Sequence, residues 1–139
     1  MAVKFLSNLS HDRRVPIRRI VLLEDFLAAT KPECHAQGLI PYCKENPGLY
    51  IERRVNLWRA VFPDASGPLV LDSTGLGGHV HGLEAHYITK GGIGLWIAEA
   101  RALPNLGMPL ESFTLVLDGD PIPTKTTEIF QNVVQRDAA

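Results

Sequence analysis

Residues 16–25 read PIRRIVLLED, and this run gives the clearest indication of the architecture. Its apolar residues at 20–23 follow one another without interruption, which is typical of a strand covered on both faces, the usual case in a parallel sheet. A second run, PLESFTLVLD at 109–118, aligns with the first at its proline, at one leucine (Leu22 and Leu115) and at its final aspartate. Each run follows a segment with helical spacing, so the sequence predicts helix–strand units that stack side by side.

The other segments supply the helices and loops of this arrangement. Apolar residues at helical spacing predict three helices, near residues 5–9, 52–61 and 95–103. Residues 34–43 read as a mixed loop and residues 69–72 as a short strand. The tail, 122–139, predicts an amphipathic helix that caps the open end of the stack. We therefore expect an α/β fold with a small, mostly parallel sheet and helices on at least one of its faces.

Composition sets the class of protein. The chain has 139 residues, of which 45% are hydrophobic, so it can bury a core as one domain, 1–139, without metal or disulfide staples. The formal net charge of −1 gives no general attraction to nucleic acid or to an acidic membrane surface. No apolar stretch has the length of a signal-peptide core or of a membrane span, which predicts a cytoplasmic or nuclear protein. In that reducing environment we expect Cys34 and Cys43 to be free thiols.

Arginine pairs flank apolar residues in two of these segments. They are Arg18 and Arg19 at the first strand run, and Arg53 and Arg54 within the predicted 52–61 helix. This pattern is typical of the solvated face of an amphipathic element, and it also suits contact with an acidic protein partner. These four arginines are the candidate partner-binding residues.

Histidines gather in one glycine-flanked segment, with His79, His81 and His86 close together and Glu84 between them. On a strand, His79 and His81 project from the same face, and His-x-His pairs bind zinc, iron or manganese with this geometry. Glu84 or His86 would supply a third ligand. The flanking glycines also suit a polar surface loop or a pH-sensitive contact. We expect no cofactor, and the alternative is a divalent metal such as zinc bound by this cluster.

The sequence does not complete the common motifs for nucleotide binding or for nucleophilic catalysis. The glycine-rich residues 73–78 follow the predicted 69–72 strand, where phosphate-binding loops occur, but their spacing matches neither common nucleotide-binding motif. The sequence contains no Gly-x-Ser-x-Gly motif. Cys34 and His35 are direct neighbours, whereas a nucleophile and its base usually come from separate elements. The sequence therefore favours binding over catalysis.

Several segments together resemble uncharacterised proteins of filamentous fungi. They are residues 17–25, 32–47 and 51–58, and the strand around Leu115 extends the resemblance. Some of those fungal proteins look like F-box proteins followed by a leucine-rich-repeat-like region, in which the F-box binds an adaptor and the repeats present a surface to substrates. The segment before Pro16 is too short for an F-box. The resemblance therefore implies a truncated leucine-rich-repeat-like unit and carries over neither adaptor binding nor a catalytic residue.

The expected function is a protein–protein interaction or scaffolding domain, with the substrate-recognition-like role that the resemblance implies. The alternative is a small metal-dependent enzyme that uses the histidine cluster. Stacked units bury their faces only against neighbours, so a short array leaves apolar surface and unpaired strand edges at its ends. We expect a protein partner, or a second copy in a homodimer, to cover that surface at the amino-terminal end.

Overall fold

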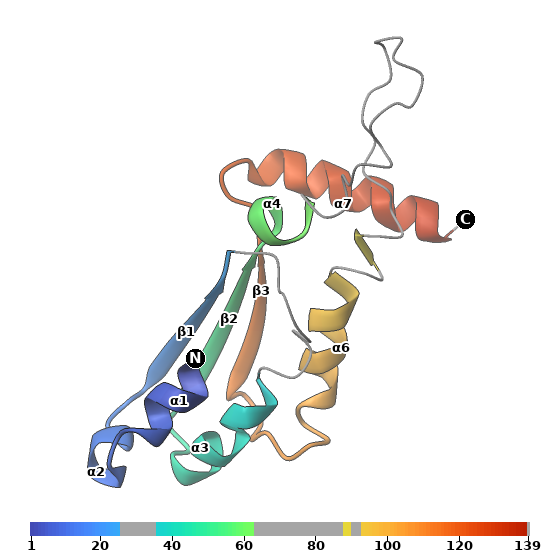
Figure 1. Cartoon of the computed structure of the whole chain (residues 1–139). Helices are drawn as coiled ribbons and strands as arrows, with labels where there is room; N and C mark the ends of the chain where they lie inside the picture. Colours follow the sequence, from blue (N-terminus) through green and yellow to red (C-terminus); the bar gives the residue numbers. More distant parts are fainter. Residues whose placement is uncertain (26–35, 63–87, 90–92, 139) are drawn as a thin grey trace.

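A single parallel sheet organises the chain. The computed structural model describes residues 1–25, 36–62, 88–89 and 93–138, and Figure 1 shows their arrangement. The strands β1 (Arg19–Glu24), β2 (Tyr50–Asn56) and β3 (Phe113–Asp118) form this sheet in the order β1-β2-β3. The described strands thus follow one another across the sheet in sequence order. The predicted α/β class with a small parallel sheet is confirmed.

Helices connect and flank the strands. They are α1 (Ala2–Ser7), α2 (His11–Arg14), the 3₁₀ helix η2 (Gln37–Leu39), α3 (Ile40–Glu45), α4 (Leu57–Ala60), α6 (Gly94–Ala102) and α7 (Pro123–Ala138). The helix predicted at 95–103 is confirmed by α6, which ends shortly before Pro104. The tail forms α7, whose role as a cap stays a prediction. Within the described residues, none of the helices has the length and hydrophobicity of a membrane-spanning segment.

The register of the sheet places equivalent residues of the aligned runs side by side. Leu22 pairs with Arg53, and Arg53 pairs with Leu115, so the two aligned leucines occupy the same level of the sheet on either side of β2. The distance from a proline to the start of the following strand is also the same for β1 and β2. Pro47 stands three residues before Tyr50 as Pro16 stands three before Arg19, and Arg19 pairs with Tyr50. β1 and β2 therefore each begin three residues after a proline.

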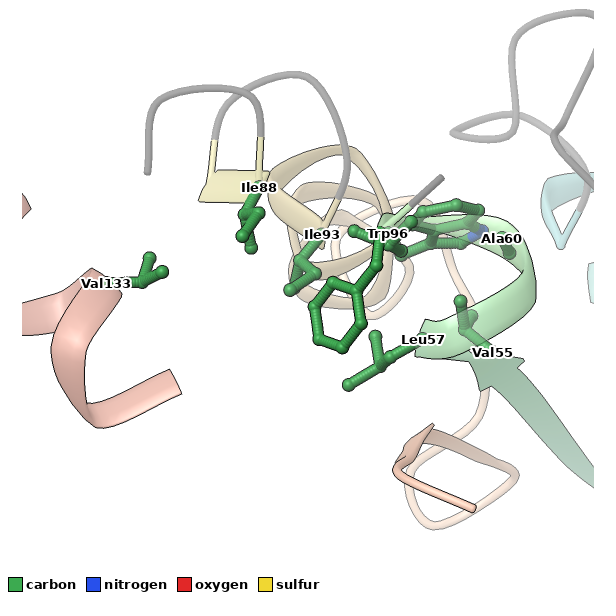
Figure 2. Packing of buried hydrophobic residues seen from close by; sticks show 9 residues of the cluster. Val55, Leu57, Ala60, Ile88, Ile93, Trp96 and Val133 are labelled. Atoms are coloured by element: carbon green, nitrogen blue, oxygen red, sulfur yellow. The ribbon is translucent and has the colours of Figure 1, made fainter. Parts of the chain in front are cut away.

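Two apolar clusters bind the helices to one face of the sheet. The first joins α1, η2, α3 and the segment after α6 to the amino-terminal half of the strands, and includes Leu6, Leu39, Cys43, Ile51 and Leu103. The second lies toward the carboxyl ends of the strands and draws residues from β2, α4, α6 and α7 (Figure 2). Its members include Val55, Leu57, Ile93, Trp96 and Val133. The start of α7 is fixed beside α4, because Trp58 Nε1 donates to Thr126 Oγ1 at 2.8 Å.

Two of the predictions about local structure are wrong. The predicted helix at 52–61 is strand through Asn56, and only Leu57–Ala60 is helical. Ile51 and Val55 are buried at alternate positions of β2, but the charged Arg53 between them hides the alternation in the sequence. Of the predicted loop at 34–43, the described residues 36–43 contain η2 and the start of α3. The predicted strand at 69–72 lies outside the described residues.

The expectation that the first strand is covered on both faces is also wrong. The burial pattern of β1 alternates strictly between exposed and partly buried residues. Ile20 and Leu22 pack against the first apolar cluster, whereas Val21 and Leu23 are exposed. The uninterrupted apolar run conceals this alternation, because two of its members lie on the solvent side.

Candidate interaction surface

One face of the sheet carries no described helix. Side chains alternate along a strand, and those that face the helices pack in the two apolar clusters. The side chains between them lie on the opposite side, which we call the open face. It consists of Arg19, Val21, Leu23, Tyr50, Glu52, Arg54, Asn56, Thr114, Val116 and Asp118.

The open face exposes apolar side chains along β1. Val21 is 41% exposed and Leu23 is 69% exposed. Leu23 stands level with Arg54 and Val116, so the charged Arg54 lies between two apolar residues across the sheet. Purely parallel sheets almost always have both faces covered. An uncovered face with apolar residues is therefore the feature of the described chain that most needs a partner.

Charged side chains alternate in sign across the same face. Arg19 Nη2 donates to Glu52, and Arg54 Nε donates to Glu52 Oε1 at 2.7 Å. Arg54 Nη1 also lies 3.7 Å from Asp118 Oδ2. The hydrogen bond from Arg19, assisted by that from Arg54, lowers the pKa of Glu52 against the opposing effect of burial. The row of charges spans the three strands, with Arg19 on β1, Glu52 and Arg54 on β2 and Asp118 on β3.

The structure separates the four predicted partner-binding arginines. Arg19 and Arg54 lie on the open face, with 60% and 44% of their side chains exposed. Arg18 is exposed before the start of β1, where its Nη1 donates to Val15 O at 2.9 Å and to Asn46 Oδ1 at 3.3 Å. The prediction that Arg53 binds a partner is wrong, because its side chain is fully buried on the helix side of the sheet.

Arg53 instead joins the sheet to two carboxylates. Its Nε and Nη2 donate to Glu24 Oε1 at 3.0 and 2.8 Å, and its Nη1 donates to Glu99 on α6. The other oxygen of Glu99 accepts the main-chain N–H of Ala36 at 2.8 Å. A buried guanidinium keeps its charge when carboxylates and hydrogen bonds replace water. This ion cluster is an internal support of the sheet.

A second charged cluster, which the sequence did not suggest, lies between the helices that precede β1 and β2. Arg14 donates to both oxygens of Glu45 at 2.9 and 2.7 Å, and His11 Nδ1 lies 2.8 Å from Glu45 Oε1. These contacts join α2 to α3. The hydrogen bonds from Arg14 and then His11 lower the pKa of Glu45 to about 2. We call this link between α2 and α3 the helix clasp. Both carboxylate oxygens of Glu45 already have hydrogen-bond partners in it.

The histidine cluster of His79, His81 and His86, with Glu84, lies outside the described residues. Among the residues that the structure does describe, no group of histidine, cysteine or acidic side chains could hold a metal ion. Cys43 is a free thiol in the first apolar cluster. Burial raises the pKa of the Cys43 thiol, which disfavours the nucleophilic thiolate.

The fold and the open face define a small α/β domain whose parallel sheet is covered by helices on one side and presents charged and apolar side chains on the other. Comparisons of the chain with protein-family models, curated proteins and solved structures found no match. The resemblance to fungal F-box-associated proteins and to leucine-rich-repeat-like units therefore stays a prediction.

Proposed function

We propose that this chain is a protein-interaction domain that binds a partner protein on the open face of its sheet. The observation that carries the proposal is a sheet face that no described helix covers, with Leu23 69% exposed beside Arg54. Apolar side chains supply the area that drives association, and the fixed arginines supply orientation.

The charge row supports a protein partner over a small molecule. Small-molecule sites are concave and bury most of the ligand, whereas the open face is built on neighbouring strands with exposed apolar and charged groups side by side. Arginine is enriched at protein interfaces and forms bidentate contacts with carboxylates. Arg19 and Arg54 retain exposed surface although each already contacts Glu52. We expect the partner to place acidic and apolar side chains on this face.

Site-specific photo-crosslinking tests the proposal. A photoreactive amino acid replaces Thr114, which is exposed on β3 at the level of Glu52, and in a control it replaces Thr127, which is exposed on α7. We expect a discrete protein adduct from position 114 in the host cell and none from position 127. The adduct is identified by mass spectrometry, and its binding is then measured with both proteins purified.

Charge reversal tests the same surface without a crosslinker. Arg54→Glu places a third acidic group beside Glu52 and Asp118, and it should weaken binding of the identified partner about tenfold or more, as expected for an interfacial arginine. Arg101→Glu is the matched control, because Arg101 is exposed on α6, away from the open face. Equal adducts from positions 114 and 127, or equal binding by the two charge variants, would contradict the proposal.

A further inference from the structure

The outer edge of β1 is a second surface, which shares Arg19, Val21 and Leu23 with the open face. β1 ends the described sheet, with β2 as its neighbour. Tyr50 N donates to Arg18 O at 2.9 Å. In a parallel pair, alternate residues bond to the same neighbour, so the even-numbered residues turn their main-chain groups toward β2. Arg19, Val21 and Leu23 therefore direct theirs to the outer edge, where no described strand pairs with them.

Apart from the charged Arg19 at its start, this edge lacks the usual protection against pairing. Natural edge strands are commonly short, interrupted by proline or bulges, or lined with charges that point inward. β1 is a regular strand of six residues with no proline inside it. The residues whose main-chain groups face outward include Val21 and Leu23, whose side chains are also exposed. A second strand would satisfy the main chain and place its own side chains beside these apolar ones.

We propose that a second copy of this chain pairs with the edge, β1 against β1 in antiparallel orientation, with Leu22 of each copy at the centre. A two-fold axis perpendicular to the sheet keeps the helices of both copies on one side. Opposed residues then share a face, so Val21 faces Leu23 of the second copy. Arg19 faces Asp25 of the second copy at each end of the pair.

Charge complementarity selects this register. Arg19 and Asp25 carry opposite charges, and their side chains are 60% and 41% exposed. A shift that centres the pair on Val21 would oppose Arg19 to Leu23, and a shift that centres it on Leu23 would oppose Val21 to Asp25. Directly opposed pairs of unlike charge, or of two apolar residues, are the pairs that stabilise antiparallel strands.

The self-association goes beyond the proposed function and does not depend on it. It uses the edge of β1, whereas the crosslinking position Thr114 lies on β3. The two copies would form one continuous sheet that contains the three described strands of each. The open faces of both copies would then form a single surface, which doubles the area available to a partner.

Charge exchange tests the pairing by sedimentation velocity over a series of concentrations. We expect the unmodified chain to dimerise, and Arg19→Asp or Asp25→Arg alone to weaken dimerisation, because each variant opposes like charges at both ends. The double variant restores opposite charges and should recover the dimer, while Arg101→Asp on α6 should leave it unchanged. A chain that stays monomeric throughout, or single variants that dimerise as well as the unmodified chain, would overturn the proposal.

Disulfide trapping tests the register. Val21→Cys and Leu23→Cys are made separately with Cys34 replaced by serine, and Cα atoms of directly opposed residues lie about 5.5 Å apart, within disulfide range. The mixture of the two variants should form a mixed disulfide readily on mild oxidation. Each variant alone should form much less, because identical positions are offset by two residues along the strand. Equal crosslinking in all three samples, or none in the mixture, would overturn the register.

Discussion

Replacement of Arg53 by methionine measures how much the buried ion cluster contributes to the fold. The side chains of Arg53 and Glu99 are 0% and 1% exposed, and that of Glu24 is 20% exposed. Methionine retains much of the length of arginine but removes the cation, which leaves the Glu99 carboxylate buried with the Ala36 N–H as its remaining partner. Loss of one partner of a buried pair costs about 3–5 kcal/mol. We expect the free energy of unfolding to fall by about that amount.

Urea unfolding at neutral pH gives this free energy, and a second variant separates the charge effect from the packing effect. In Arg53→Met with Glu99→Gln, the amide oxygen still accepts from the Ala36 N–H, but no buried carboxylate remains on α6. The double variant should therefore be more stable than Arg53→Met by about 1–3 kcal/mol, the range of coupling between contacting residues. The reasoning is refuted if Arg53→Met lowers the free energy of unfolding by less than about 0.5 kcal/mol, the effect of an ordinary surface change. It is also refuted if the double variant is less stable than Arg53→Met alone.

The remaining predictions concern the helix clasp, the buried thiol and metal. Hydrogen bonds from Arg14 and His11 lower the pKa of Glu45 from 4.5 to about 2, so this contribution to stability is complete above pH 4.5 and is lost as the pH falls toward 2. Melting temperatures measured across this range should fall more steeply for the unmodified chain than for Glu45→Gln. Cys43 should react with a thiol reagent far more slowly in the folded protein than in urea, because it is buried and burial raises its pKa. Elemental analysis should find no stoichiometric metal in the purified protein, and retained zinc that is lost on mutation of the histidines in 77–86 would favour the enzyme alternative.

The flanking strands were predictable from the sequence because their signals are local. The runs at 16–25 and 109–118 hold all the residues that make β1 and β3, and the aligned leucines proved to occupy the same level of the sheet. The helix before Pro104 was recognisable for the same reason, since apolar spacing and the proline both lie within the segment. Each of these elements can be identified without knowing what it touches.

The central strand could not be predicted because its stability depends on distant residues. Arg53 occupies a core position in β2, and its carboxylate partners lie 29 and 46 residues away in the sequence. In isolation the sequence Glu52-Arg53-Arg54 suggests a solvated helix face. The equal distance of Pro16 and Pro47 from the strands that follow them was the available signal for a strand. The open face could not be predicted for a related reason. Its row of charges forms only when the register of β1 and β2 brings Arg19, Glu52 and Arg54 together.

The neighbouring leucines of β1 provide the most direct test of which face is open. Leu22 packs against the first apolar cluster, and Leu115, at the same level of β3, packs against the second, whereas Leu23 is 69% exposed. Both leucines are partly buried, and an aspartate there replaces packed apolar surface with a charged group. Leu22→Asp and Leu115→Asp should therefore each destabilise the domain by several kcal/mol.

Leu23→Asp is the matched control, since it makes the identical change one residue further along the strand. Its carboxylate would remain in water beside Arg54, so its effect on the unfolding of the monomer should stay within about 0.5 kcal/mol, measured at a concentration below that of self-association. The contrast does not depend on the strand propensity of aspartate, because Leu22 and Leu23 lie on the same strand. If the two variants of β1 unfold at the same urea concentration, the sheet is covered on both sides or on neither. Both the open face and the proposed partner surface would then be wrong.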